Sequence, residues 1–178
     1  MAETFSEEIL ARLTTAHLAV DPDRLVFEPI RTGKHNTSYY VKGAGDDLVL
    51  RISPPDDAGF LFYERGMMAQ EPGLHALLRA ETTVPVAEIL VYDGSRQLVD
   101  RDYLIMERLP GRPLAERHLS KAQLDGVFAQ VGAYLAQMHA LVADRHGYLP
   151  PLPLPGGKEP PAGYEPMTPQ PTWVQAFQ

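Results

Sequence analysis

Residues 25–52 read LVFEPIRTGKHNTSYYVKGAGDDLVLRI and decide the fold. Three runs in this stretch are rich in β-branched, aromatic and aliphatic residues, at Leu25–Ile30, Thr37–Lys42 and Leu48–Ile52. The segments between them contain glycine, asparagine and aspartate, the residues that favour tight turns. The pattern therefore predicts three consecutive antiparallel strands.

Helices and two more strands are expected on either side of this meander. Apolar residues at three- and four-residue steps predict helices at about 6–18 and 121–142, the first with capping-box spacing between Thr4 and Glu7. Residues 60–80 also favour a helix, with an interruption at Pro72, and residues 84–93 and 103–109 favour strands. This order indicates an α+β fold.

Composition narrows the functional classes. The 178 residues carry a net charge of -7, which argues against a nucleic-acid or anionic-membrane surface. There are no cysteines, so disulfides and thiolate metal sites are excluded, and no apolar run is long enough for a membrane span. The acidic start lacks the plan of a signal peptide, and we expect a cytoplasmic protein.

Two features of the meander suggest chemistry. The turn at Gly33, followed by Asn36 and Ser38, would let the backbone and short polar groups approach phosphate oxygens, although a plain hairpin turn has the same composition. Arg51 is a cation in an apolar strand, on the face opposite to Leu50 and Ile52. The alternative for Arg51 is a strand arginine that reaches out to water.

Several stretches together resemble the aminoglycoside phosphotransferase family of kinase-like enzymes. They are Gly33-x-x-Asn36-x-x-Tyr39-x-Val41, LVLRI at 48–52, QEPGLHALL at 70–78, VPV at 84–86, YLIMERLPG at 103–111 and LAQMH at 135–139. The resemblance covers about residues 7–148. It implies a protein-kinase-like N-lobe at 1–109, with a five-stranded antiparallel sheet plus helices. A hinge exit and the first C-lobe helix would follow at 110–148, and a proline-rich tail with the start of the remaining C-lobe at 149–178.

The same resemblance implies an ATP site and roles for individual residues. Arg51 takes the place of the lysine that holds the α- and β-phosphates, and Glu71 pairs with it, with Glu64 as the alternative. Met106 lies behind the adenine, which the backbone carbonyl of Glu107 and the N–H of Leu109 would bind. An ordinary edge strand with a Pro-Gly exit is the alternative for this last segment.

The chain contains no H-x-D-x-x-x-x-N pattern, which in such enzymes supplies the catalytic aspartate and a Mg²⁺ ligand. We therefore expect no catalytic residue and no metal ligand here. The chain would be the truncated, nucleotide-binding portion of an enzyme that phosphorylates a small hydroxylated compound with Mg-ATP, inactive by itself. A non-catalytic nucleotide-binding module and a protein-interaction module are the alternatives, and the uncovered helix at 121–142 suggests self-association.

Overall fold

The computed structural model describes residues 4–33, 35–55, 66–147 and 170–176. Its centre is one five-stranded sheet in which every neighbouring pair is antiparallel, in the order β1-β2-β3-β5-β4. The strands are β1 (Val26–Ile30), β2 (Thr37–Lys42), β3 (Leu48–Ile52), β4 (Ile89–Asp93) and β5 (Tyr103–Glu107). The predicted α+β class and its five-stranded sheet are confirmed.

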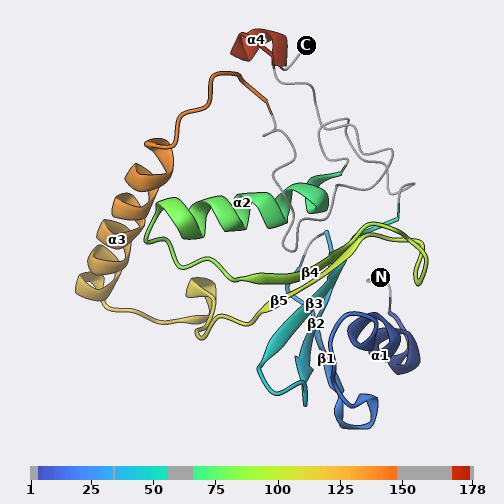
Figure 1. The fold of residues 1–178 in the computed structure, drawn as a ribbon. Coiled ribbons are helices and arrows are strands. Elements are labelled where there is room, and N and C mark those ends of the chain that lie inside the picture. Colours follow the sequence, from blue (N-terminus) through green and yellow to red (C-terminus); the bar gives the residue numbers. More distant parts are fainter. Residues whose placement is uncertain (1–3, 34, 56–65, 148–169, 177–178) are drawn as a thin grey trace.

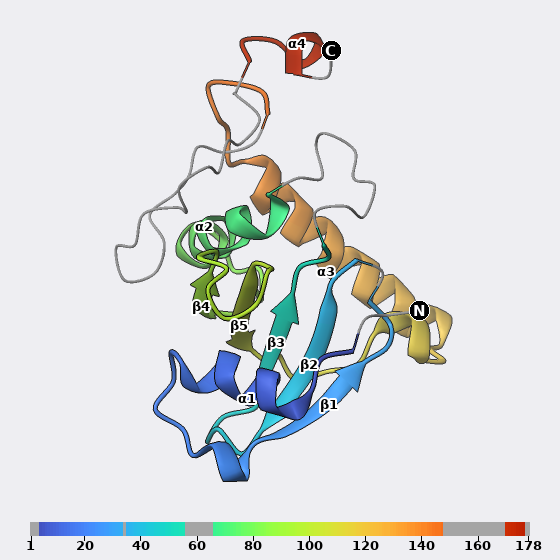
Figure 2. The same cartoon turned by 90° about the vertical axis from the view of Figure 1, so that its right-hand side faces the viewer.

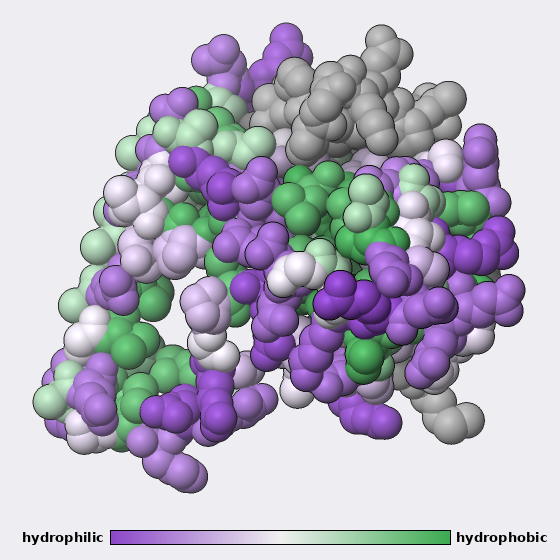
Figure 3. All heavy atoms as spheres, turned by 60° about the horizontal axis from the view of Figure 1, so that its bottom comes forward, coloured by the Kyte–Doolittle hydropathy of each residue, from purple (hydrophilic) through white to green (hydrophobic). Residues whose placement is uncertain are grey.

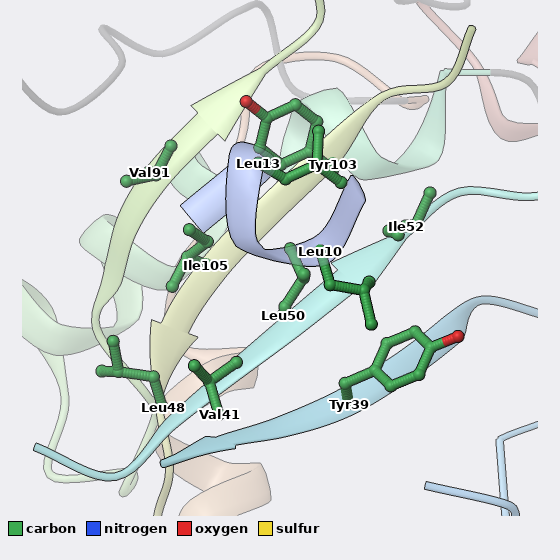
Figure 4. Packing of buried hydrophobic residues seen from close by; sticks show 10 residues of the cluster. All are labelled: Leu10, Leu13, Tyr39, Val41, Leu48, Leu50, Ile52, Val91, Tyr103 and Ile105. Carbon is green, nitrogen blue, oxygen red and sulfur yellow. The ribbon is translucent and has the colours of Figure 1, made fainter. Parts of the chain in front are cut away.

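Helix α1 (Glu7–Thr15) covers one face of the sheet, as Figures 1 and 2 show. It begins at Ser6, whose side chain accepts a hydrogen bond from the Ile9 N–H, so the cap expected at Thr4 is wrong by two residues. Leu10 and Leu13 are fully buried against strand residues that alternate along β2, β3 and β5 (Figure 4). These residues are Tyr39, Val41, Leu48, Leu50, Ile52, Tyr103 and Ile105.

Helix α2 (Met67–Glu81) lies over β4 and β5 on the other face (Figure 1). Met68 and Ala69 pack against strand residues of a second, smaller cluster, which comprises Ile89, Tyr92 and Leu104. The interruption expected at Pro72 is wrong, because one helix continues through it. Pro72 removes one helical hydrogen bond, but its ring is fully buried, and this burial offsets the loss.

Strand β4 is shorter than the expected 84–93 and begins at Ile89. Side chains from α2 bind the backbone that precedes it: His75 Nδ1 lies 2.8 Å from the Ala87 carbonyl oxygen, and Arg79 donates to the Val86 carbonyl at 3.1 Å. These carbonyls are therefore satisfied by a helix instead of by a neighbouring strand.

Helix α3 (Lys121–His139) follows β5 after a short 3-10 turn, η3 (Leu114–Glu116), and ends three residues before the expected position. Ser120 and Gln123 form a reciprocal capping box at its start. Two short elements, η1 (Pro22–Arg24) and α4 (Trp173–Ala176), complete the described chain. In the described residues, no helix combines the length and hydropathy that a membrane crossing requires.

Candidate nucleotide site

One face of the sheet, between α2 and the end of β5, carries most of the residues that sequence reasoning selected. Strand side chains alternate between faces, so the register that buries Leu50 and Ile52 against α1 turns their neighbours to the opposite side. This second surface is called the site face below. Its residues are Ser38 and Tyr40 of β2, Val49 and Arg51 of β3, and Leu104 and Met106 of β5.

An ion pair joins β3 to α2 on the site face. The Arg51 guanidinium donates two hydrogen bonds to the Glu71 carboxylate, from Nη1 to Oε2 at 2.5 Å and from Nη2 to Oε1 at 3.1 Å. The side chains of Arg51 and Glu71 are 24% and 21% exposed, so both retain access to solvent. This fork-to-fork geometry fixes the plane of the guanidinium as well as its position.

The course of α2 explains why Glu71 reaches Arg51. Because the helix does not break at Pro72, Glu71 has helical geometry and lies in the turn that follows Met68 and Ala69. Those two residues anchor the helix on β4 and β5. Glu64, the alternative partner, lies outside the described residues.

The turn between β1 and β2 stands at the same end of the sheet as Arg51. Ser38 is directly opposite Arg51 in the β2–β3 register, and both belong to the site face. The turn is tight, since a Cβ atom on Gly33 would lie 3.3 Å from the Asn36 carbonyl oxygen. Ser38 is therefore the neighbour of Arg51 across the sheet, and Gly33 and Asn36 lie in the turn that precedes Ser38.

The backbone at the end of β5 has a distinct hydrogen-bond pattern. The Arg108 N–H donates to the Asp47 carbonyl at 3.0 Å, and the Glu107 N–H donates in the opposite direction, to the Glu88 carbonyl at 2.9 Å. The Glu88 N–H donates to the Glu107 side chain, at 3.2 Å from Oε2. In the described part of the chain the Leu109 N–H has no hydrogen-bond partner, which leaves it free to donate to a ligand.

Sequence reasoning missed a contact on the site face that involves the residue between Glu107 and Leu109. The guanidinium carbon of Arg108 lies 4.0 Å from the centre of the Tyr40 ring, and Nη1 of Arg108 lies 3.4 Å from Oδ2 of Asp47. The motif MERL predicted a role for the backbone groups of Glu107 and Leu109 and none for the Arg108 side chain. A period-two count along β2 and β5 would have placed Tyr40 and Arg108 on one face.

A second polar cluster, also missed, lies on the opposite face. His17, after α1, places Nε2 3.0 Å from Asp93 Oδ2 and 2.8 Å from the Tyr103 hydroxyl, which itself donates to Asp93 Oδ2 at 3.1 Å. Burial tends to raise the pKa of Asp93, but hydrogen bonds from Ser95, His17 and Tyr103 outweigh it and leave that pKa lowered. Burial, together with the Asp93 charge, raises the pKa of Tyr103.

Of the predicted site residues, Ser38, Arg51, Glu71 and Met106 come together on the site face or against it. Glu107 and Leu109 mark the exit of the chain from the sheet, and Gly33 and Asn36 mark the turn before β2. Among the described residues there is no group of three or more histidine, cysteine or acidic side chains that could hold a metal ion. The arrangement offers an oriented cation and free backbone groups, which suit the binding of an anion with a hydrogen-bonding base.

Comparison with solved structures shows which proteins share this fold. A protein from Ralstonia eutropha JMP134, provisionally assigned as an aminoglycoside phosphotransferase, matches with a TM-score of 0.57 and 22% identity over 78% of this chain. A microcompartment-associated aminopropanol kinase (TM-score 0.51, 18% identity, 84% of this chain) and a protein from Haemophilus somnus 129PT provisionally assigned as a fructosamine-3-kinase (0.50, 18%, 96%) also match. The chain spans only 39%, 43% and 48% of these three proteins, respectively.

Comparison with sequence families identifies the family of this chain more directly than the solved structures do. No curated protein matches the chain. The model of the Phosphotransferase enzyme family, however, matches residues 26–168, which include the sheet, the Arg51–Glu71 pair and α3. This match confirms the resemblance found in the motifs. The chain belongs to the Phosphotransferase enzyme family.

Proposed function

We propose that this chain binds ATP on the site face, as the nucleotide-binding half of a kinase-like phosphotransferase. The complete enzyme would transfer the γ-phosphoryl group of ATP to a hydroxyl of a small molecule. The division into an N-lobe at 1–109, a hinge exit with the first C-lobe helix at 110–148, and a tail at 149–178 is part of this proposal, and so is a cytoplasmic location, where ATP is available.

The Arg51–Glu71 pair carries the proposal. A guanidinium has five N–H donors, and Glu71 accepts two hydrogen bonds from Arg51. The remaining donors, held in a fixed plane, suit the oxygens of a phosphate chain. Ser38, opposite Arg51, adds a hydroxyl donor, and the Gly33 turn with Asn36 is the segment proposed to approach the phosphates.

The end of β5 would hold the base. We assign the free Leu109 N–H and the Glu107 carbonyl to the hydrogen-bonding edge of adenine, with Met106 behind the ring. Figure 3 shows an open gap between the sheet and the part of the chain that contains α3, on the side of the molecule that comes forward in that view. A ligand that bridges the β5 end and Arg51 has an approach from this side.

The described residues provide no ligand set for the Mg²⁺ that the family resemblance implies. The described residues contain no cluster of three potential ligands, and the full chain has no H-x-D-x-x-x-x-N sequence. We therefore assign no catalytic step to this chain and expect it to bind nucleotide without transferring phosphate. The alternatives are a stand-alone module that binds nucleotide without belonging to an enzyme, and a protein-interaction module that does not bind nucleotide.

Isothermal titration calorimetry of the 178-residue chain with ATP tests the proposal. We expect measurable binding that weakens at least tenfold in Arg51→Ala, because a charge-assisted contact contributes about 1.5–3 kcal/mol. The matched control is Arg12→Ala, which removes an equal charge from an exposed position of α1, on the opposite face of the sheet. Absence of ATP binding by the unmodified chain, or equal affinity of Arg51→Ala and Arg12→Ala, would contradict the proposal.

Self-association through α3 is a further part of the proposal. None of the residues of this helix is buried, and Phe128, Val131 and Leu135 are 61%, 45% and 42% exposed. Residues 126–138 of α3 carry no charged side chain. Figure 3 shows hydrophobic residues interspersed with hydrophilic ones along the left edge of the molecule, where α3 lies. A helix with exposed apolar side chains and no buried residue favours association.

A further inference from the structure

We propose that Arg108 competes with the nucleotide base for the site face, so that base binding requires this side chain to move. The inference rests on the proposed function, because it uses the assignment of the β5 end to the base. It concerns a residue to which neither the motifs nor the comparisons give a role.

The path of the Arg108 side chain is the first argument. Arg108 follows β5, and Tyr40 belongs to β2, with β3 between the two strands. Neighbouring strands are about 4.8 Å apart, so a contact from β5 to β2 crosses about 10 Å of sheet. Arg108 lies opposite Asp47, since its N–H donates to the Asp47 carbonyl, and Tyr40 lies opposite Val49. Since its guanidinium lies 4.0 Å from the Tyr40 ring centre, the Arg108 side chain reaches over the start of β3, from the row of Asp47 toward the row of Val49.

The place of Val49 relative to the proposed ligand contacts is the second argument. Val49 is opposite Met106 in the β3–β5 register and two residues before Arg51 on the same face. A base bound by Glu107 and Leu109, with its phosphates at Arg51, would have to lie over this part of β3. The guanidinium therefore occupies part of the surface over which the base would have to lie.

The contacts that hold the Arg108 side chain are weak enough for a bound base to replace them. The side chain is 34% exposed, and its partner Asp47 is 62% exposed, so their 3.4 Å ion pair contributes little. The contact with the Tyr40 ring contributes the larger part of the free energy that holds the Arg108 side chain, and its strength is that of an exposed cation–π interaction. A base that stacks on the sheet must give up this contact, which reduces affinity by about two- to fivefold.

Removal of Arg108 should therefore tighten ATP binding. We expect the dissociation constant of ATP, measured by calorimetry on the 178-residue chain, to be about two- to fivefold lower in Arg108→Ala than in Arg112→Ala. Arg112 is an exposed arginine four residues later, so its removal changes the net charge equally. Asp47→Asn, which loosens the Arg108 side chain without removing it, should give a smaller change in the same direction.

Inorganic tripolyphosphate, tested as a competitor of ATP, separates the base from the phosphates. Its affinity should not increase in Arg108→Ala relative to Arg112→Ala, because it has no base. Equal or weaker ATP binding in Arg108→Ala overturns the inference while the proposed function stands, and so does a gain shared by both ligands. Absence of ATP binding by the unmodified chain overturns both. Thermal unfolding followed by circular dichroism confirms that each variant is folded.

Discussion

Substitution of Tyr103 by phenylalanine tests whether the hydrogen bonds among His17, Asp93 and Tyr103 stabilise the packing of α1 on the sheet. Tyr103 is 1% exposed, so phenylalanine keeps the ring and its packing and removes only the hydroxyl. That hydroxyl donates to Asp93 Oδ2 at 3.1 Å and lies 2.8 Å from His17 Nε2. The variant therefore removes two hydrogen bonds that connect the chain after α1 with β4 and β5.

The size of the effect follows from these two bonds. A hydrogen bond to a charged group contributes about 1.5–3 kcal/mol and a neutral one about 0.5–1.5 kcal/mol. Asp93 retains hydrogen bonds from the Ser95 N–H at 2.7 Å and from His17 at 3.0 Å, and the side chains of Asp93 and His17 are 12% and 21% exposed. Water and the remaining partners replace part of the loss. We expect the free energy of unfolding to fall by about 1–2 kcal/mol at pH 7.

The pH dependence gives a second measure of the same cluster. Because the folded-state pKa of Asp93 is lowered from 3.8, the stabilisation is present above that value and is lost as the pH falls through the lower folded pKa. Because the pKa of Tyr103 is raised from 10.0, its contribution is full below pH 10 and is lost as the pH rises above it. The difference between the unmodified chain and Tyr103→Phe should therefore narrow at both extremes.

Urea unfolding followed by circular dichroism at 222 nm, repeated from pH 3 to pH 10.5, measures these differences. Tyr40→Phe is the control, since it removes a tyrosine hydroxyl from the opposite face of the same sheet. A loss of less than about 0.5 kcal/mol for Tyr103→Phe would show that the cluster does not fasten α1. A loss that stays constant across the pH range would show that the charge of Asp93 plays no part.

Two further predictions concern the core and the uncovered helix. Leu50→Ala, at a position with no exposed surface between α1 and the sheet, should lower the free energy of unfolding by about 2–5 kcal/mol in the same urea assay, and a loss below 1 kcal/mol would contradict the assigned core. The double variant Phe128→Glu/Leu135→Glu should bind less of an apolar-surface dye and sediment as a smaller species than the unmodified chain. Unchanged dye binding and sedimentation would show that α3 does not mediate association.

The strands were predictable from local patterns, whereas their arrangement was not. Alternation in residues 25–52 predicts three strands, and each is present within one residue of its expected bounds. Nothing local places β5 between β3 and β4, and the sequence analysis predicted no strand order. The helix through Pro72 was missed because a propensity argument counts the lost hydrogen bond and omits the burial of the proline ring.

The polar clusters were missed for a different reason. The hydrogen bonds of His17 reach 76 and 86 residues along the chain, and no motif or periodicity connects positions so far apart. The Arg51–Glu71 pair spans only 20 residues, and the resemblance supplied both members in advance. Sequence reasoning thus located the pair and overlooked the contacts that only the folded sheet creates.

The register of the meander determines both the core and the candidate site. A slip of one residue in β3 would turn Leu50 and Ile52 away from α1 and Arg51 into the core, away from Glu71. The turn before β3 resists such a slip, because Gly43 has φ +86° and a Cβ there would lie 1.9 Å from the Arg24 carbonyl oxygen. The apolar residues that hold β3 under α1 therefore also hold Arg51 toward α2, and a substitution that shifts the register must affect stability and nucleotide binding together.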